Sequence, residues 1–115
     1  RPRAQLQIQG PNGRYTDYAL VDTGADFLQI PAASAQTIGI GLHTHNHRHI
    51  NVYVANGTSG QMLLLLDVDV RIQGKLITTP LLLNPGGGKS LLGRTALLTA
   101  LEVGFNATEW LWLPY

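Results

Sequence analysis

The chain has 115 residues, which predicts one compact domain over residues 1–115 and leaves no room for a second lobe. Its net charge is +1 with 13% charged residues, so it offers no basic stripe for nucleic acid. Cysteine is absent, which excludes a disulfide framework, and no apolar run approaches the roughly 18 residues of a membrane span, so no membrane contact is expected. Because the chain opens at Arg1, we expect a processed product or an excised domain.

Short apolar runs separated by Gly, Pro and Asn predict a mainly β fold. The expected strands cover residues 5–9, 15–21, 28–30, 50–54, 62–66, 67–72, 76–83, 103–105 and 109–113. Pro11–Asn12–Gly13 closes the first hairpin, and the polar residues 56–60 form the tip of a second one. A short helix is expected at 32–38, between Pro31 and Gly39, and a more regular one at roughly 95–101.

One motif carries chemistry. The apolar residues 19–21 lead into Asp22–Thr23–Gly24. Asp22 supplies a carboxylate, Thr23 has a hydroxyl that can hydrogen-bond across a dimer axis, and Gly24 allows a tight turn and a close approach of substrate. These three residues alone fit an ordinary turn between strands equally well.

Two neighbouring carboxylates that share one proton can act as base towards water and as acid towards a carbonyl. The motif occurs once in this chain. If Asp22 works in this way, the second carboxylate comes from a second copy, and the motif implies a homodimer.

Three motifs in order give the chain its resemblance to the retropepsin-like aspartic proteases, the family of retroviral proteases and their cellular and bacterial relatives. Residues 21–26 match the catalytic turn, residues 54–57 resemble the flap segment, and Leu91–Leu92–Gly93–Arg94 before a helix matches the apolar-apolar-Gly-Arg signature. The resemblance implies a single-lobe, closed β-barrel-like fold with one short helix in the C-terminal half. It also implies a symmetric homodimer that hydrolyses polypeptide substrates without a metal or cofactor.

The resemblance assigns site residues as well. Asp22, Thr23 and Gly24 are implied to be catalytic, and substrate contacts are implied for Ala25, Asp26, Tyr53, Val54, Ala55, Asn56 and Gly57. Tyr53 fits an ordinary strand position equally well. Arg94 is expected to support the turn by pairing with Asp26, with both charges largely shielded from water. Pocket or nearby core positions are expected for Leu20, Leu28, Ile30, Val52, Val54 and Leu92.

Two features depart from the viral members. Thr95 stands where they have Asp or Asn, so the start of the second helix needs another cap, which the Thr hydroxyl can supply. Residues 106–115 lie beyond their usual end. The terminal hairpin, with Trp110 and Trp112, is expected either to join a remodelled dimer interface or to fold back on its own lobe.

His43, His45, His47 and His49 recur at every second residue, which on a strand would place them on one face. All four cannot close on one ion and the run contains no carboxylate or Cys, so no metal site is expected. We expect exposed histidines that add pH-dependent charge beside the flap.

The sequence is compatible with two candidate functions. The first is an aspartic endopeptidase that binds extended peptides under a flap. The alternative is a retropepsin-like dimerisation or peptide-binding module with little or no turnover. The intact Asp22–Thr23–Gly24 motif favours the first, because a pure binder has no need of two buried carboxylates.

Overall fold

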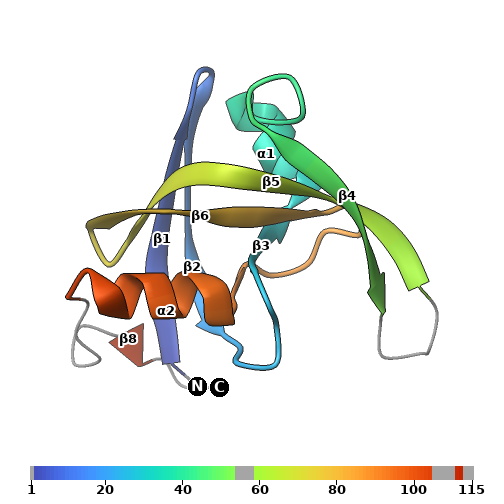
Figure 1. The fold of residues 1–115 in the computed structure, drawn as a ribbon. Coiled ribbons are helices and arrows are strands. Elements are labelled where there is room, and N and C mark those ends of the chain that lie inside the picture. The colour runs from blue at the N-terminus through green and yellow to red at the C-terminus, as the bar shows by residue number, and fades with distance from the viewer. Residues whose placement is uncertain (1, 54–58, 105–110, 113–115) are drawn as a thin grey trace.

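The computed structural model describes residues 2–53, 59–104 and 111–112, and the fold is mainly β with two short helices (Figure 1). The elements in chain order are β1 (Pro2–Gly10), β2 (Gly13–Val21), β3 (Leu28–Pro31), α1 (Ala32–Ile38), β4 (His47–Tyr53), β5 (Ser59–Ile72), β6 (Lys75–Asn84), β7 (Leu91–Leu92), α2 (Arg94–Glu102) and β8 (Leu111–Trp112).

Six of these strands form a closed barrel. They follow the order β5–β6–β3–β7–β2–β1, and the pairing of Leu6 in β1 with Ile72 in β5 completes the ring. The ring confirms the expectation of a mainly β, closed, barrel-like lobe. β4 extends the sheet beyond β5, and Figure 1 shows these two strands leaving the barrel as an arm.

The barrel interior follows from strand alternation. Ala4, Leu6 and Ile8 of β1 are completely buried, while the intervening glutamines lie on the other face. Successive side chains of a strand point to opposite faces, so a polar-apolar alternation places one set in the core.

β5 carries an irregularity at the point where the sequence predicts a boundary between two strands. Residues 59–72 form one strand, and the register with β6 shifts between Leu65 and Val68. Both of these side chains are in the core although they are three residues apart, which strict alternation forbids. An extra residue at a β-bulge restores the inward phase, so the boundary expected after residue 66 is a bulge within one strand.

Helix α1 has the expected bounds. Pro31 precedes it, and Gly39 ends it with a φ of 84°, a left-handed conformation that favours glycine. Ala35 and Ile38 are its buried residues, and the helix packs against β2, β3 and β6.

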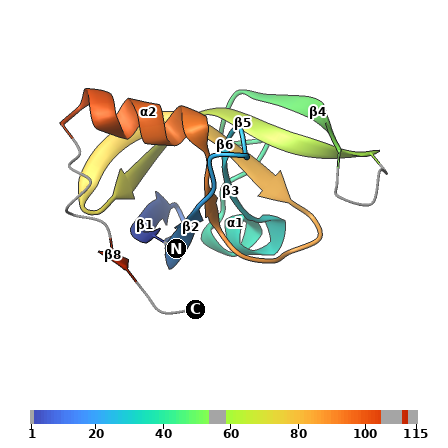
Figure 2. The same cartoon turned by 90° about the horizontal axis from the view of Figure 1, so that it is seen from below.

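Helix α2 packs on the outside of the barrel against β6 and β3, as Figure 2 shows from below. Neither helix of the described chain is long and apolar enough to cross a membrane. Ala96 and Ala100 are the buried residues of α2.

The expected strand at 103–105 is wrong at its described residues. Val103 is the C-cap of α2, and Gly104 follows in a turn with a φ of 89°. β8 instead pairs with β1 of the same chain, Leu111 opposite Arg3. Phe105, Trp110 and the side chain of Trp112 lie outside the described residues, and the interface expected there stays a prediction.

Candidate functional site

Asp22 follows β2 directly, and β7 fixes the position of its backbone. β2 and β7 are parallel, with Leu20 opposite Leu91 and Val21 opposite Leu92. The Asp22 amide donates to the Leu92 carbonyl at 3.1 Å. The second expected motif, residues 91–94, therefore lies beside the first.

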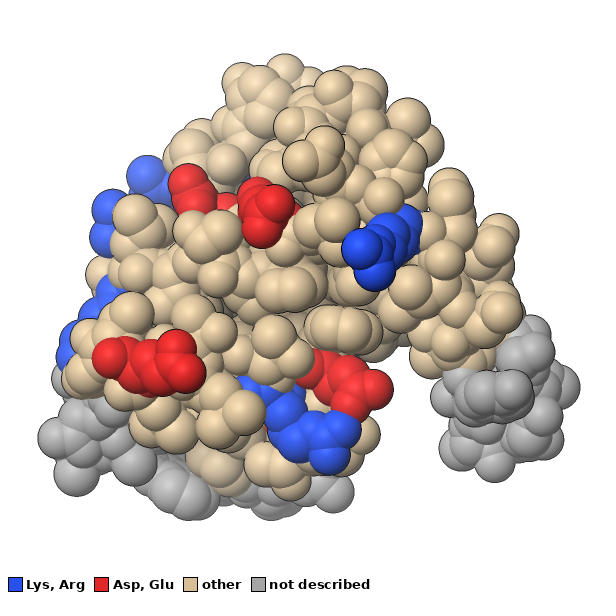
Figure 3. All heavy atoms as spheres, viewed as in Figure 1, with Lys and Arg blue, Asp and Glu red and all other residues tan. Residues whose placement is uncertain are grey.

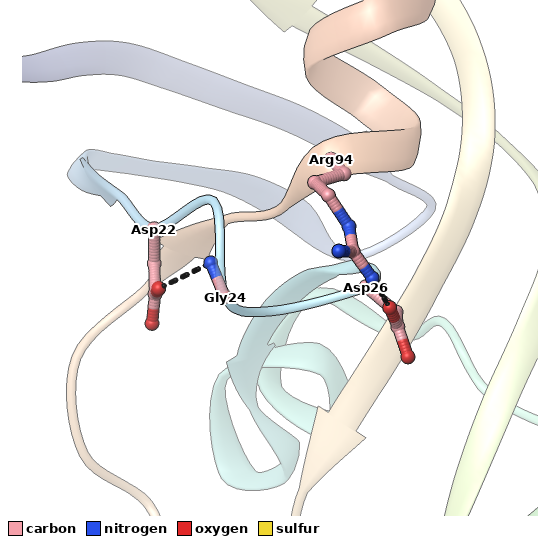
Figure 4. A network of polar contacts seen from close by, with 4 residues as sticks. All are labelled: Asp22, Gly24, Asp26 and Arg94. Carbon is pink, nitrogen blue, oxygen red and sulfur yellow. Dashed lines mark hydrogen bonds and ion pairs between the residues drawn. The ribbon is translucent and has the colours of Figure 1, made fainter.

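The turn itself is closed by two hydrogen bonds. The Asp22 Oδ1 atom accepts a hydrogen bond from the Gly24 amide at 3.0 Å (Figure 4). The Asp22 carbonyl accepts one from the Ala25 amide at 3.1 Å. Among the described residues no donor reaches Oδ2. The turn thus orients one carboxylate oxygen and leaves the other available, while the Thr23 side chain is exposed.

The loop after this turn is attached to the first turn of α2. The Arg94 amide donates to the Ala25 carbonyl at 2.9 Å, and the Thr95 amide donates to the Asp26 carbonyl at 3.0 Å. No side chain caps the helix. The cap expected from the Thr95 hydroxyl is therefore wrong, because loop carbonyls accept from the amides that a side-chain cap would serve.

Gly93 makes this attachment possible. A Cβ atom at Gly93 would lie 2.5 Å from the Phe27 carbonyl oxygen and 2.8 Å from the Ala25 carbonyl oxygen. Its φ of −84° and ψ of −179° are accessible to any residue, so glycine is required here for space alone.

Arg94 also forms the expected ion pair with Asp26, through its Nη2 atom (Figure 4). The Arg94 side chain is 57% exposed and the Asp26 side chain 65% exposed. The expectation that this pair is shielded from water is wrong for the single chain, because more than half of each side chain is exposed. Ion pairs this exposed contribute about 0 to 1 kcal/mol.

Farther back along β2, a partly buried hydrogen bond holds the residues that lead into β7. The Tyr15 hydroxyl lies 2.7 Å from Ser90 Oγ, and Ser90 is completely buried. Burial raises the pKa of Tyr15 above its usual value, and the nearby Asp17 carboxylate adds to this, while the Ser90 hydrogen bond acts in the opposite direction. The Ser90 carbonyl in turn accepts from the Leu20 amide at 2.9 Å.

A cleft of about 610 Å³ lies beside the Asp22 turn. Asp22, Gln29 and loop residues 24–27 line it, and β4 and β6 contribute Ile50, Asn51, Val52 and Leu82. Figure 3 shows a hollow between the β4–β5 arm and the barrel. On the face seen there, acidic and basic side chains are interspersed in small groups.

The cleft contains only some of the predicted site residues. Asp22, Gly24, Ala25 and Asp26 line it, and so does Val52. Val54, Ala55, Asn56 and Gly57, together with the side chain of Tyr53, lie outside the described residues, so the flap stays a prediction.

Several of the expected pocket positions belong to the core. Leu28, Ile30 and Leu92 are completely buried there, which selects core over pocket among the two positions expected for them, and Leu20 is half-buried. Their neighbours Phe27 and Gln29, one residue out of phase, line the cleft instead and were missed. The signal was the strand alternation, which needed to be phased against the barrel interior.

The histidine run is divided between two conformations. His47 and His49 lie in β4, whereas His43 and His45 precede it in a turn, so the four do not share one strand face. Three of them are exposed and His45 is half-buried. Within the described residues, no group of three or more His, Asp or Glu side chains could hold a metal ion.

The chain matches no protein-family model, and a search of the curated proteins finds no relative. The site is therefore interpreted from its own residues.

Proposed function

We propose that this chain is one subunit of a symmetric homodimeric aspartic endopeptidase of the retropepsin-like type. The observation that carries the proposal is the Asp22 turn. It presents a carboxylate, with one oxygen that no donor of the described residues reaches, at the edge of a 610 Å³ cleft, from a loop held by both β7 and α2.

The proposed reaction uses one Asp22 from each subunit. The ionised carboxylate takes a proton from a water molecule as the water oxygen attacks the peptide carbonyl carbon. The protonated carboxyl group donates its proton to the carbonyl oxygen. The resulting diol then collapses: one of its hydroxyl groups gives a proton to the ionised carboxylate, the C–N bond breaks, and the leaving nitrogen receives the proton held by the other carboxyl group.

The loop attachments support this chemistry by holding the carboxylate still. Backbone hydrogen bonds from Asp22 to β7 and from α2 to residues 25 and 26 restrict the turn at both ends. A catalytic group held in its reactive geometry does not have to be ordered during the reaction, which lowers the activation barrier.

An extended peptide is the ligand that the cleft favours. β4 is the outermost strand of the described sheet, so one edge of β4 has no neighbouring strand among the described residues. Residues 50–52 of β4 line the cleft. A peptide can bind such an edge through main-chain hydrogen bonds while apolar side chains enter the cleft.

A cleavage assay on a mixture of unrelated peptides, read by mass spectrometry, tests the proposal. We expect cleavage by the parent chain and none by Asp22→Asn, whereas Asp67→Asn, an exposed aspartate on β5, serves as the matched control and cleaves normally. Peptide binding without cleavage would favour the alternative, a binding module. Cleavage by Asp22→Asn would contradict the proposed mechanism.

A further inference from the structure

We propose that Gln29 determines the specificity of the cleft by selecting peptides that place a carboxamide side chain, Asn or Gln, beside it. The inference rests on the proposed function, because it assumes that a peptide occupies the cleft.

The position of Gln29 follows from the alternation of β3. Leu28 and Ile30 are completely buried in the barrel core, so the side chain between them points to the opposite face. That face lines the cleft. Gln29 is paired in register with Leu82 of β6 on one side and Leu91 of β7 on the other. Its carboxamide therefore lies between two leucine positions.

The Gln29 side chain is half-buried, and its carboxamide makes no hydrogen bond among the described residues, so its polar atoms are left in contact with water. Two other polar side chains of the cleft are already engaged, Asp22 with the Gly24 amide and Asp26 with Arg94. A bound peptide would displace water from the Gln29 amide. Displacement is unfavourable unless the peptide replaces the lost hydrogen bonds.

Asn51 is the other neutral amide among the described residues that line the cleft, and its surroundings differ. It lies on the β4 arm opposite Gln61 and is exposed. Its hydrogen bonds to water can persist when a peptide binds, so Asn51 imposes a weaker requirement than Gln29.

The chemistry of an amide identifies the preferred partner. The Gln29 side chain has both donors and an acceptor, and a second carboxamide can accept from it and donate to it at once. A carboxylate only accepts, so it leaves the acceptor oxygen of Gln29 without a donor. An alkyl group of the same size satisfies neither atom, and a site with an unpaired polar group rejects such an analogue.

The test compares matched peptides. Starting from any peptide that the parent chain cleaves, each position flanking the cleaved bond is varied in turn between Gln and Met, which are close in size. We expect one position, or two positions related by the dimer axis, where Gln is preferred by about tenfold in kcat/KM. In Gln29→Met this preference falls below about twofold, while Gln36→Met, an exposed glutamine on α1, retains it.

A binding measurement keeps the inference separate from catalysis. The same peptide pairs are titrated onto Asp22→Asn and onto the Asp22→Asn, Gln29→Met double variant. Loss of the amide preference in the double variant supports the role of Gln29 even in a protein that cleaves nothing. An amide preference that survives Gln29→Met, absence of the preference at every position in the parent, or failure to bind any peptide would each overturn the inference.

Discussion

The attachment of the loop to α2 depends on the missing side chain of Gly93, so Gly93→Ala is the sharpest structural perturbation available. The new methyl group would lie 2.5 Å from the Phe27 carbonyl oxygen, 2.7 Å from the Phe27 nitrogen and 2.8 Å from the Ala25 carbonyl oxygen. All three are backbone atoms, so no side chain can rotate away. Either α2 or the loop has to move.

The cost can be estimated from the contacts that this movement disturbs. Overpacking costs about 1 to 3 kcal/mol. Weakening the two hydrogen bonds from Arg94 and Thr95 to the loop adds about 0.5 to 1.5 kcal/mol each. The smaller conformational freedom of alanine in the unfolded chain returns about 0.4 to 1 kcal/mol. We expect a net loss of about 1 to 5 kcal/mol in the free energy of unfolding.

Urea denaturation at one fixed protein concentration measures this loss, because the stability of a dimer depends on concentration. Gly60→Ala is the matched control. A Cβ atom there meets nothing within 4 Å, and the change should stay within about 0.5 kcal/mol. Equal stability of Gly93→Ala and the parent chain would refute the argument from close approach. We also expect lower peptidase activity in Gly93→Ala, because the displaced loop carries Asp22.

Three further predictions follow from the same site. Arg94→Ala should cost at most about 1 kcal/mol in urea denaturation, because the ion pair with Asp26 is exposed; a loss of about 3 to 5 kcal/mol would contradict this and show that an assembly buries the pair. Tyr15→Phe should lower the free energy of unfolding by about 1 kcal/mol at neutral pH. Because the pKa of Tyr15 is raised in the folded state, the parent should lose stability as pH rises above about 10, and the variant should lose less. Urea denaturation measures both, and an equal loss of stability at alkaline pH in parent and variant would contradict the prediction. Peptidase turnover should depend on pH as a bell-shaped curve, and a rate that only rises into alkaline pH would contradict the shared proton. If positive charge on the histidines weakens the closed flap, activity should extend to lower pH in a variant with His43, His45, His47 and His49 changed to Gln.

Local patterns were sufficient to predict the first hairpin, α1 and the loop motifs. Pro11–Asn12–Gly13 marks the turn of the hairpin, and Pro31 and Gly39 mark the two ends of the helix. Such signals depend on only a few neighbouring residues. The boundary expected after residue 66 shows a feature that local patterns could not predict. A change of phase in the apolar alternation marks either a strand end or a bulge, and only the pairing with β6 distinguishes them.

The site was predictable in its motifs and less so in its surroundings. The pairing of Asp26 with Arg94 was expected, but its exposure depends on where the loop lies relative to the barrel, and no short motif encodes that. Leu28 and Gln29 show the same limit. Alternation predicts that they face opposite sides, yet which side is core is decided by the closure of the ring. The cleft residues therefore required the fold.

The central claim is that each active unit contains two Asp22 carboxylates from two chains. Subunit mixing tests it most directly. Parent chain at a fixed concentration that keeps it dimeric is allowed to exchange with increasing amounts of Asp22→Asn chain, and peptide cleavage is measured after each addition. Mixed dimers hold one Asp22 and are inactive, so activity should fall to about half at an equal amount of variant and continue to fall with more. Activity that stays constant at every mixing ratio would contradict the claim, because it would mean that each chain cleaves peptides alone.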